Sequence, residues 1–156
     1  MSIGVTVDVA GLPQKIRRAR NRFDMNQLLA SVGNAHLFEI NKQFTSEGAH
    51  FGSPWKPLAP STLARRRKKG RGAKILRDTR RLEQSFVRGK PDSAFRRNRT
   101  LATVTVGTQT EYAEQHEKGL ARVPRRRILP TKAQARLTAK REVQAALRFA
   151  FRGANR

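Results

Sequence analysis

The chain has 156 residues, enough for one domain with a real hydrophobic core but too few for two. It contains no cysteine, which excludes disulfides and thiolate zinc sites and agrees with synthesis in a reducing cytosol. Its 34 Lys and Arg residues against 11 Asp and Glu residues give a formal net charge of +23, which predicts an acidic partner, either nucleic acid or an acidic protein surface.

The N-terminal segment lacks the basic and apolar regions of a signal peptide. No segment approaches a membrane span, so we expect a soluble protein that is not exported by a signal peptide and has no membrane partner. Alternating apolar residues from Ile3 to Val9 predict a strand. Pro13 suits the first turn of a short basic helix that runs to about Arg22.

A longer helix is predicted to open at Asp24, which lies three residues before Gln27 in a variant of the capping box. Apolar residues recur from Met25 to Phe44, mostly at spacings of three, four or seven, and so form one buried stripe. Gly48 is placed to end this helix. We expect it to be the core helix of the domain.

A rigid, extended loop follows, with Pro54 and Pro57 on either side of Trp55 and a third proline three positions on. The indole is either a buried anchor or an exposed contact for a partner, and the cost of leaving its apolar area in water favours the anchor. We therefore expect Trp55 to hold the loop against the long helix around Ile40 and Phe44.

Ser61 is placed to cap a helix that soon becomes a basic arm at about 61–77. No acidic residue lies between Glu47 and Asp78. The arm is either a solvated, flexible loop or a segment that orders against phosphate or an acidic subunit. Its candidate contacts with a partner or DNA are Arg65, Arg66, Arg67, Lys68, Lys69, Arg71 and Lys74.

The middle of the chain predicts a short helix from Asp78 or Thr79 that buries Leu82. After a turn, the basic stretch 96–99 leads to a clear strand over 101–107, in which Val and Thr residues alternate.

In the C-terminal part, one or two helical turns over 112–118 are expected to end at Gly119. Thr131 with Gln134 forms a capping box that opens a terminal helix, whose apolar residues include Leu137. Between them, residues 123–130 are extended and carry three further candidate contacts, Arg125, Arg126 and Arg127.

These elements predict an α+β fold, with a small antiparallel or mixed sheet packed against the long amphipathic helix and the C-terminal helix. We expect a single domain over 1–152, with the basic arm as an extension and a short tail at 153–156.

The histidines do not form a metal site, because His36, His50 and His116 are far apart and Leu120 stands where a second ligand of a zincin motif would be. No nucleophile elbow or glycine-rich phosphate loop occurs. We expect no enzymatic activity, no cofactor and no metal. His116 is expected to be a structural residue.

The acidic residues Glu111, Glu114 and Glu117 share one predicted helix, which favours a solvated acidic face that could meet a basic neighbour. No helix-turn-helix, zinc-finger or aromatic RNA-binding signature occurs. Any contact with DNA would be to phosphates, independent of sequence and sensitive to salt.

An ordered set of pieces covers nearly the whole chain: the strand and helices before Phe44, the Trp55 loop, the stretch 75–85 and the stretch 106–129. The last of these contains Tyr112 and His116, which we expect to be structural anchors like Trp55. In order and spacing, the set resembles the phage virion-morphogenesis, or tail-completion, proteins of Mu-like and P2-like contractile-tailed phages. The family usually has Gly at position 80 and commonly Gln or another polar residue at 117, where this chain has Arg80 and Glu117.

The resemblance implies a non-enzymatic structural protein at the head–tail junction of the virion, present in the host cytoplasm during assembly. It implies a homo-oligomeric ring, commonly a hexamer, beside neck or connector proteins and the tail tube or tail terminator. Non-specific contact with the DNA in the channel is also expected. From composition alone, the alternative is a basic nucleic-acid-binding protein without sequence preference.

Overall fold

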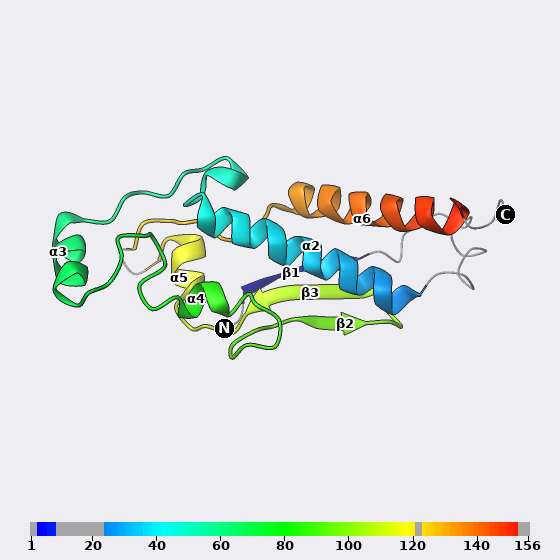
Figure 1. The fold of residues 1–156 in the computed structure, drawn as a ribbon, viewed down its shortest axis with the longest axis horizontal. Coiled ribbons are helices and arrows are strands. Elements are labelled where there is room, and N and C mark those ends of the chain that lie inside the picture. Colours follow the sequence, from blue (N-terminus) through cyan, green and yellow to red (C-terminus); the bar gives the residue numbers. More distant parts are fainter. Residues whose placement is uncertain (1–2, 9–23, 121–122, 153–156) are drawn as a thin grey trace.

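The computed structural model describes residues 3–8, 24–120 and 123–152 (Figure 1). The fold is α+β, as predicted. The predicted helix after Pro13 and the tail 153–156 lie outside the described residues. In chain order the elements are β1 (Ile3–Asp8), α2 (Met25–Thr45), the 3-10 turn η2 (Ala49–Phe51), α3 (Pro60–Lys68), α4 (Arg81–Gln84), β2 (Arg96–Asn98), β3 (Thr103–Thr108), α5 (Ala113–Lys118) and α6 (Lys132–Arg152).

The described strands form an antiparallel sheet in the order β1-β3-β2, with Val5 opposite Val106. In β3, Val104 and Val106 are buried, whereas Thr103 and Thr105, which alternate with them, are partly exposed. This matches the predicted alternation. The edge strand β2 was not predicted, because its residues Arg-Arg-Asn are all exposed and carry no apolar alternation.

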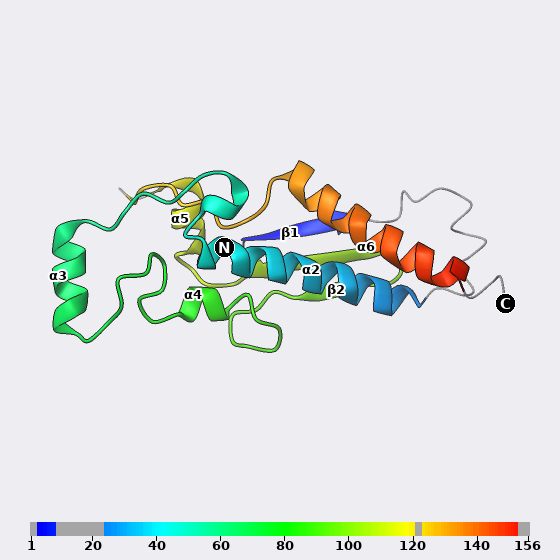
Figure 2. The ribbon, with the colours of Figure 1, turned by 45° about the horizontal axis from the view of Figure 1, so that its top comes forward.

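Helices α2 and α6 lie side by side across one face of the sheet (Figure 2). At the start of α2, the Asp24 carboxylate accepts the amides of Asn26 (2.9 Å) and Gln27 (3.3 Å), which confirms the predicted cap. The residues of α2 that face the core are Leu28, Leu29, Val32, Ile40 and Phe44.

The C-terminal end of α2 differs from the prediction, because the helix ends at Thr45 rather than close to Gly48. The Glu47 amide donates to the Phe44 carbonyl (3.3 Å) and the Gly48 amide to the Gln43 carbonyl (2.9 Å), the two bonds of a Schellman motif. The left-handed position that usually takes glycine is occupied by Glu47, with φ of 49°.

The N-terminus of α6 is the predicted capping box: the Thr131 hydroxyl accepts the Gln134 amide (3.2 Å), and the Gln134 carbonyl accepts the Thr131 amide (2.9 Å). The predicted apolar face needs one correction, since Leu137 is 56% exposed. Ala135 and Val143, which are also apolar positions of the predicted helix, are buried, as is Ala139 between them. These residues are spaced by four, and their small side chains let α6 approach α2 closely.

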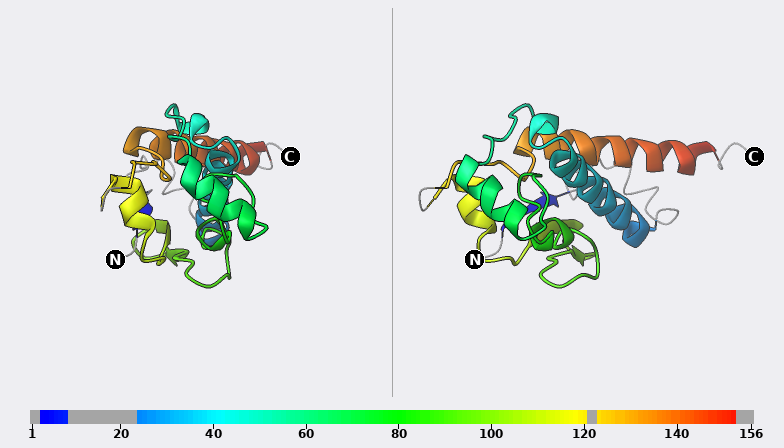
Figure 3. Two further views of the ribbon diagram at one scale, coloured as in Figure 1. Left: turned by 90° about the vertical axis from the view of Figure 1, so that its left-hand side faces the viewer. Right: turned by 60° about the vertical axis from the view of Figure 1, so that its left-hand side comes forward.

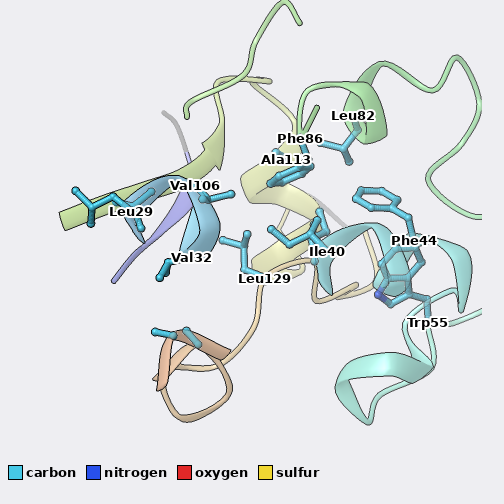
Figure 4. Close-up of a cluster of buried hydrophobic side chains, with 14 of the residues drawn as sticks. Leu29, Val32, Ile40, Phe44, Trp55, Leu82, Phe86, Val106, Ala113 and Leu129 are labelled. Atoms are coloured by element: carbon cyan, nitrogen blue, oxygen red, sulfur yellow. The ribbon is translucent and has the colours of Figure 1, made fainter. Parts of the chain in front are cut away.

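The core lies between α2, the sheet, α4 and the Trp55 loop (Figure 4). At the C-terminal end of α2, the Phe44 ring contacts those of Trp55 and Phe86 at centroid distances of 5.5 Å and 5.9 Å. Leu82 of α4 closes this part of the core. The molecule is elongated, with α3 at one end and the C-terminal end of α6 at the other (Figure 1).

Candidate partner-binding surface

The predicted basic arm forms a lobe, which we call the basic lobe and define as residues 59–78. Its helix α3 begins at Pro60, so Ser61 is not the cap, in contrast to the sequence prediction. Ala59 occupies the cap position in an extended conformation (ψ 146°), as expected of a residue before proline, and makes no side-chain cap bond. Proline is preorganised for the first position of a helix, and this sets the boundary.

Arg66 holds the basic lobe together from inside. The residue is 9% exposed, and its guanidinium donates to the carbonyls of Gly72 (3.3 Å) and Lys74 (2.7 Å). Its Nε also lies 3.4 Å from the Asp78 carboxylate. The expectation that Arg66 contacts a partner needs revision, because its hydrogen bonds fold the return segment back onto α3.

Glu47 fixes the lobe to the body of the domain. Its carboxylate accepts the Ile75 amide (2.8 Å), and its backbone carbonyl accepts the Trp55 amide (2.7 Å). The Ile75 side chain is buried. The incoming and outgoing connections of the lobe are therefore both attached to the end of α2.

Of the remaining cations of the basic lobe, Arg77 is half-buried and pairs with Glu83, and the others point to solvent. Arg71 is exposed but bonds the Asp78 carboxylate at 2.8 Å. Among the described residues, no carboxylate pairs with the other exposed cations of the lobe, which are Arg65, Arg67, Lys68, Lys69 and Lys74. These side chains are free to bind an anionic partner.

Trp55 lies against Phe44, as expected from the sequence. Its ring is 5% exposed and nearly perpendicular to that of Phe44, and its Nε1 donates to the Arg127 carbonyl (2.9 Å). Pro54 and Pro57 on either side remain exposed. The indole thus joins the base of the lobe to α2 and to the segment that precedes α6.

That segment, residues 123–130, is extended as predicted, but its arginines have different surroundings from those expected. Arg126 is 6% exposed and donates to the Lys56 carbonyl (3.1 Å). Arg127 donates to the Phe51 carbonyl and lies over the Phe51 ring, 5.7 Å from its centroid. Both arginines brace the Trp55 loop, and Arg125 alone of the three is exposed.

The predicted acidic face also needs correction. The Glu117 carboxylate points inward and accepts the amides of Ile128 (2.6 Å) and Leu129 (3.1 Å). Glu114 pairs with Lys118 at 2.5 Å, so only Glu111 has no partner among the described residues. Spacing predicted all three residues on one helix, but α5 begins at Ala113 and Glu111 precedes it. Spacing also carries no signal for the backbone amides that Glu117 meets across the fold.

A cleft of about 1030 Å³ separates the basic lobe from the body. Tyr112 and His116 line it on the side of α5, with ring centroids 6.1 Å apart in a perpendicular arrangement. Burial, and next the positive charge of Arg126, hold the pKa of His116 below its ordinary value. Burial also lowers the pKa of Arg126, and the nearby Arg66 guanidinium lowers it further. The sequence did not reveal this cleft, since its walls come from distant segments.

Within the three described ranges, no group of three or more His, Cys, Asp or Glu side chains is arranged to hold a metal ion. None of the helices in that part of the chain is long and apolar enough to cross a membrane. The features that stand out are therefore the exposed cations of the basic lobe and the cleft behind it.

Comparison with protein families gives a match to the phage virion morphogenesis family over residues 13–148. No curated protein and no solved structure matches the chain. The matched range extends from before α2 to near the end of α6 and includes the Trp55 loop, the basic lobe and the bracing segment. The chain belongs to the phage virion morphogenesis family, which indicates a structural or assembly role in the virion.

Proposed function

We propose that this protein is a structural component of the phage neck or tail end, acting without catalysis to complete the tail or join it to the head. It forms a homo-oligomeric ring, a hexamer by family resemblance, between the head connector and the tail. Its neighbours are the neck or connector proteins and the tail tube or tail terminator. It is made in the host cytoplasm and remains at the head–tail junction of the virion.

The observation that carries this proposal is the basic lobe. Three of its unpaired cations, Arg65, Arg67 and Lys68, lie on α3, which is at one end of the molecule. Bonds of Arg66 and Glu47 hold the segment that returns from α3 in place. Exposed charges contribute little to the stability of a fold, so this arrangement favours a binding role. An oligomer with a charge of +23 per chain also gains from acidic neighbours or channel DNA, which offset its self-repulsion.

The test is complementation of a phage that lacks the gene product. We expect the deletion to abolish tail-bearing particles, and wild-type protein to restore them. The lobe variant should fold as wild type by circular dichroism but restore few particles; it changes to Ser the residues Arg65, Arg67, Lys68 and Lys69. A control with the same change in charge, which should restore particles fully, replaces with Ser the exposed residues Lys90, Arg96, Arg136 and Lys140.

Normal infectious particles from the deletion phage would refute the proposal. Equal rescue by the lobe variant and by wild type would refute the function of the basic lobe. Arg66→Ser is kept separate, because the loss of its internal bonds should destabilise the lobe itself.

A second candidate, a nucleic-acid-binding protein without sequence preference, is favoured by the same unpaired cations and the high net charge. Titration of the purified protein with duplex DNA across a range of salt separates the two. Tight binding to any duplex near physiological salt supports the second candidate. Weak binding together with incorporation into particles supports the function in the neck or tail.

A further inference from the structure

The cleft between the basic lobe and α5 has walls of two chemical kinds. Helices α3 and α5 both lie at the end of the molecule that faces the viewer in the left panel of Figure 3. The apolar surface of the cleft includes Leu58, Leu76 and Pro124, whereas Arg65 of α3 and Arg126 of the segment before α6 bring positive charge. A volume of about 1030 Å³ is at the upper end of the range for pockets that enclose small ligands. Such a cleft accepts a short stretch of extended peptide but not a DNA duplex.

The positive charge of the cleft is not neutralised by carboxylates of its own lining. Arg126 is 6% exposed, and no carboxylate pairs with it among the described residues. Its Nε and the Nδ1 of His116 are buried without a hydrogen-bond partner. Asp78, the carboxylate of the lining, is already bound by Arg66 and Arg71. Buried polar groups in folded proteins are nearly always paired, and the Arg126 Nε–H can only donate, so it indicates an external acceptor.

A second copy of this chain is a poor source of that acceptor. Almost all its carboxylates are engaged within their own copy, since among the side chains that the structure describes only Glu111 has no partner. The engaged carboxylates are Asp24, Glu39, Glu47, Asp78, Glu83, Asp92, Glu114, Glu117 and Glu142.

We propose that the cleft between α3 and α5 binds an acidic segment of a different protein, in which carboxylates alternate with apolar side chains. The carboxylates would meet Arg65 and Arg126, and the apolar side chains would pack on Leu58 and Leu76. The identity of that protein as a neck or tail component rests on the proposed function, but the binding itself does not. Any contact with DNA would be made by the exposed cations of the basic lobe outside the cleft.

The test uses purified full-length protein and fluorescence anisotropy with two labelled probes, a short peptide in which Asp alternates with Leu and Ala, and a DNA duplex. Thr62→Trp fills the cleft without changing charge, and Ala64→Trp is its matched control on α3 outside the cleft lining. Arg65→Ser removes a charge from the cleft, and Arg67→Ser removes the same charge from outside the lining.

We expect Thr62→Trp and Arg65→Ser to weaken peptide binding by about tenfold, and the two controls by less than about twofold. Duplex binding should weaken equally with Arg65→Ser and Arg67→Ser and should not change with Thr62→Trp. Thermal unfolding of each variant shows whether it is folded. If Thr62→Trp does not fold, the comparison of Arg65→Ser with Arg67→Ser still tests the inference.

Three results would overturn the inference: no peptide binding by wild type, equal loss with both Arg variants and none with Thr62→Trp, or loss of duplex binding with Thr62→Trp. The last would assign the cleft to nucleic acid. Failure of the proposed function is recognised separately, since it appears as normal particles from the deletion phage whatever the peptide does. If the deletion abolishes particles but Thr62→Trp binds the peptide as wild type does, only the assignment of the cleft is refuted.

Discussion

Trp55→Ala tests whether the indole fixes the base of the basic lobe. The substitution removes a ring that is 5% exposed, its edge-on contact with Phe44 and its hydrogen bond to the Arg127 carbonyl. The carbonyl keeps one partner, because the Gln43 side-chain amide also donates to it at 2.7 Å. The main loss is therefore of packing, and it leaves a cavity beside α2.

Replacement of a buried Trp by Ala costs roughly 3–5 kcal/mol in the free energy of unfolding. For a domain of this size, each kcal/mol lowers the melting temperature by about 2–4 °C, so we expect a fall of about 6–20 °C. Trp55→Phe keeps an aromatic ring and loses the hydrogen bond, which contributes about 1 kcal/mol. The Phe variant should therefore recover most of the stability.

The assay is urea unfolding at fixed pH and salt, followed by far-ultraviolet circular dichroism. Tryptophan fluorescence cannot report unfolding here, because the variants lose the only tryptophan. Phe149→Ala serves as a control, because that ring is 84% exposed and its removal should change stability by less than about 0.5 kcal/mol. A loss below about 1 kcal/mol in Trp55→Ala would contradict the packing argument. So would a stable monomer that fails only in assembly, which would make Trp55 a partner contact.

The other predictions concern single positions around the lobe and cleft. Arg80 has a left-handed backbone (φ 59°), which glycine adopts without strain. Arg80→Gly should therefore stabilise the fold by up to about 1 kcal/mol in thermal unfolding, and Arg80→Ala should not. Equal effects of the two variants would show that removal of the Arg80 charge, and not relief of backbone strain, changes the stability. Glu117→Ala should lower the free energy of unfolding by about 2–3 kcal/mol in urea, because the amides of Ile128 and Leu129 lose a charged acceptor. Glu117→Gln keeps an acceptor oxygen and should lower it by about 1 kcal/mol. Similar losses in the two variants would contradict this reasoning. The lowered pKa of His116 means that the unfolded chain binds its proton more readily, so stability should fall as pH drops below about 6.5, and His116→Asn should lack this component.

Local signals in the sequence were sufficient for most of the elements. Asp24 with Gln27 and Thr131 with Gln134 marked two helix starts, because caps act over three residues and need nothing from the rest of the fold. The strand around Val104 followed from alternation. The boundary at Ser61 was wrong because Pro60 begins the helix and leaves the cap position to Ala59. The boundary at Gly48 was wrong because Glu47 takes the left-handed position.

The candidate site was less accessible from sequence, since an arginine run does not show which member is buried. Arg66 and its exposed neighbour Arg65 look alike in the chain, but the carbonyls of Gly72 and Lys74 surround only Arg66. The same holds for Arg126, whose acceptor at Lys56 lies 70 residues away. Long-range pairing decides burial, and it is invisible to local periodicity.

The use of carboxylates inside the fold bears on how the proposed ring would assemble. Since almost every described acidic side chain is bound within its own copy, ion pairs between copies contribute little, and a charge of +23 on each chain opposes their approach. An acidic neighbour removes this repulsion and offers a partner for each basic lobe. If the protein acts as proposed, we expect an acidic surface of the neck or tail to recruit the copies, and the ring to close upon that surface rather than in free solution. A ring that formed in low salt from purified protein alone would contradict this order, because screening is weakest there and repulsion between copies greatest.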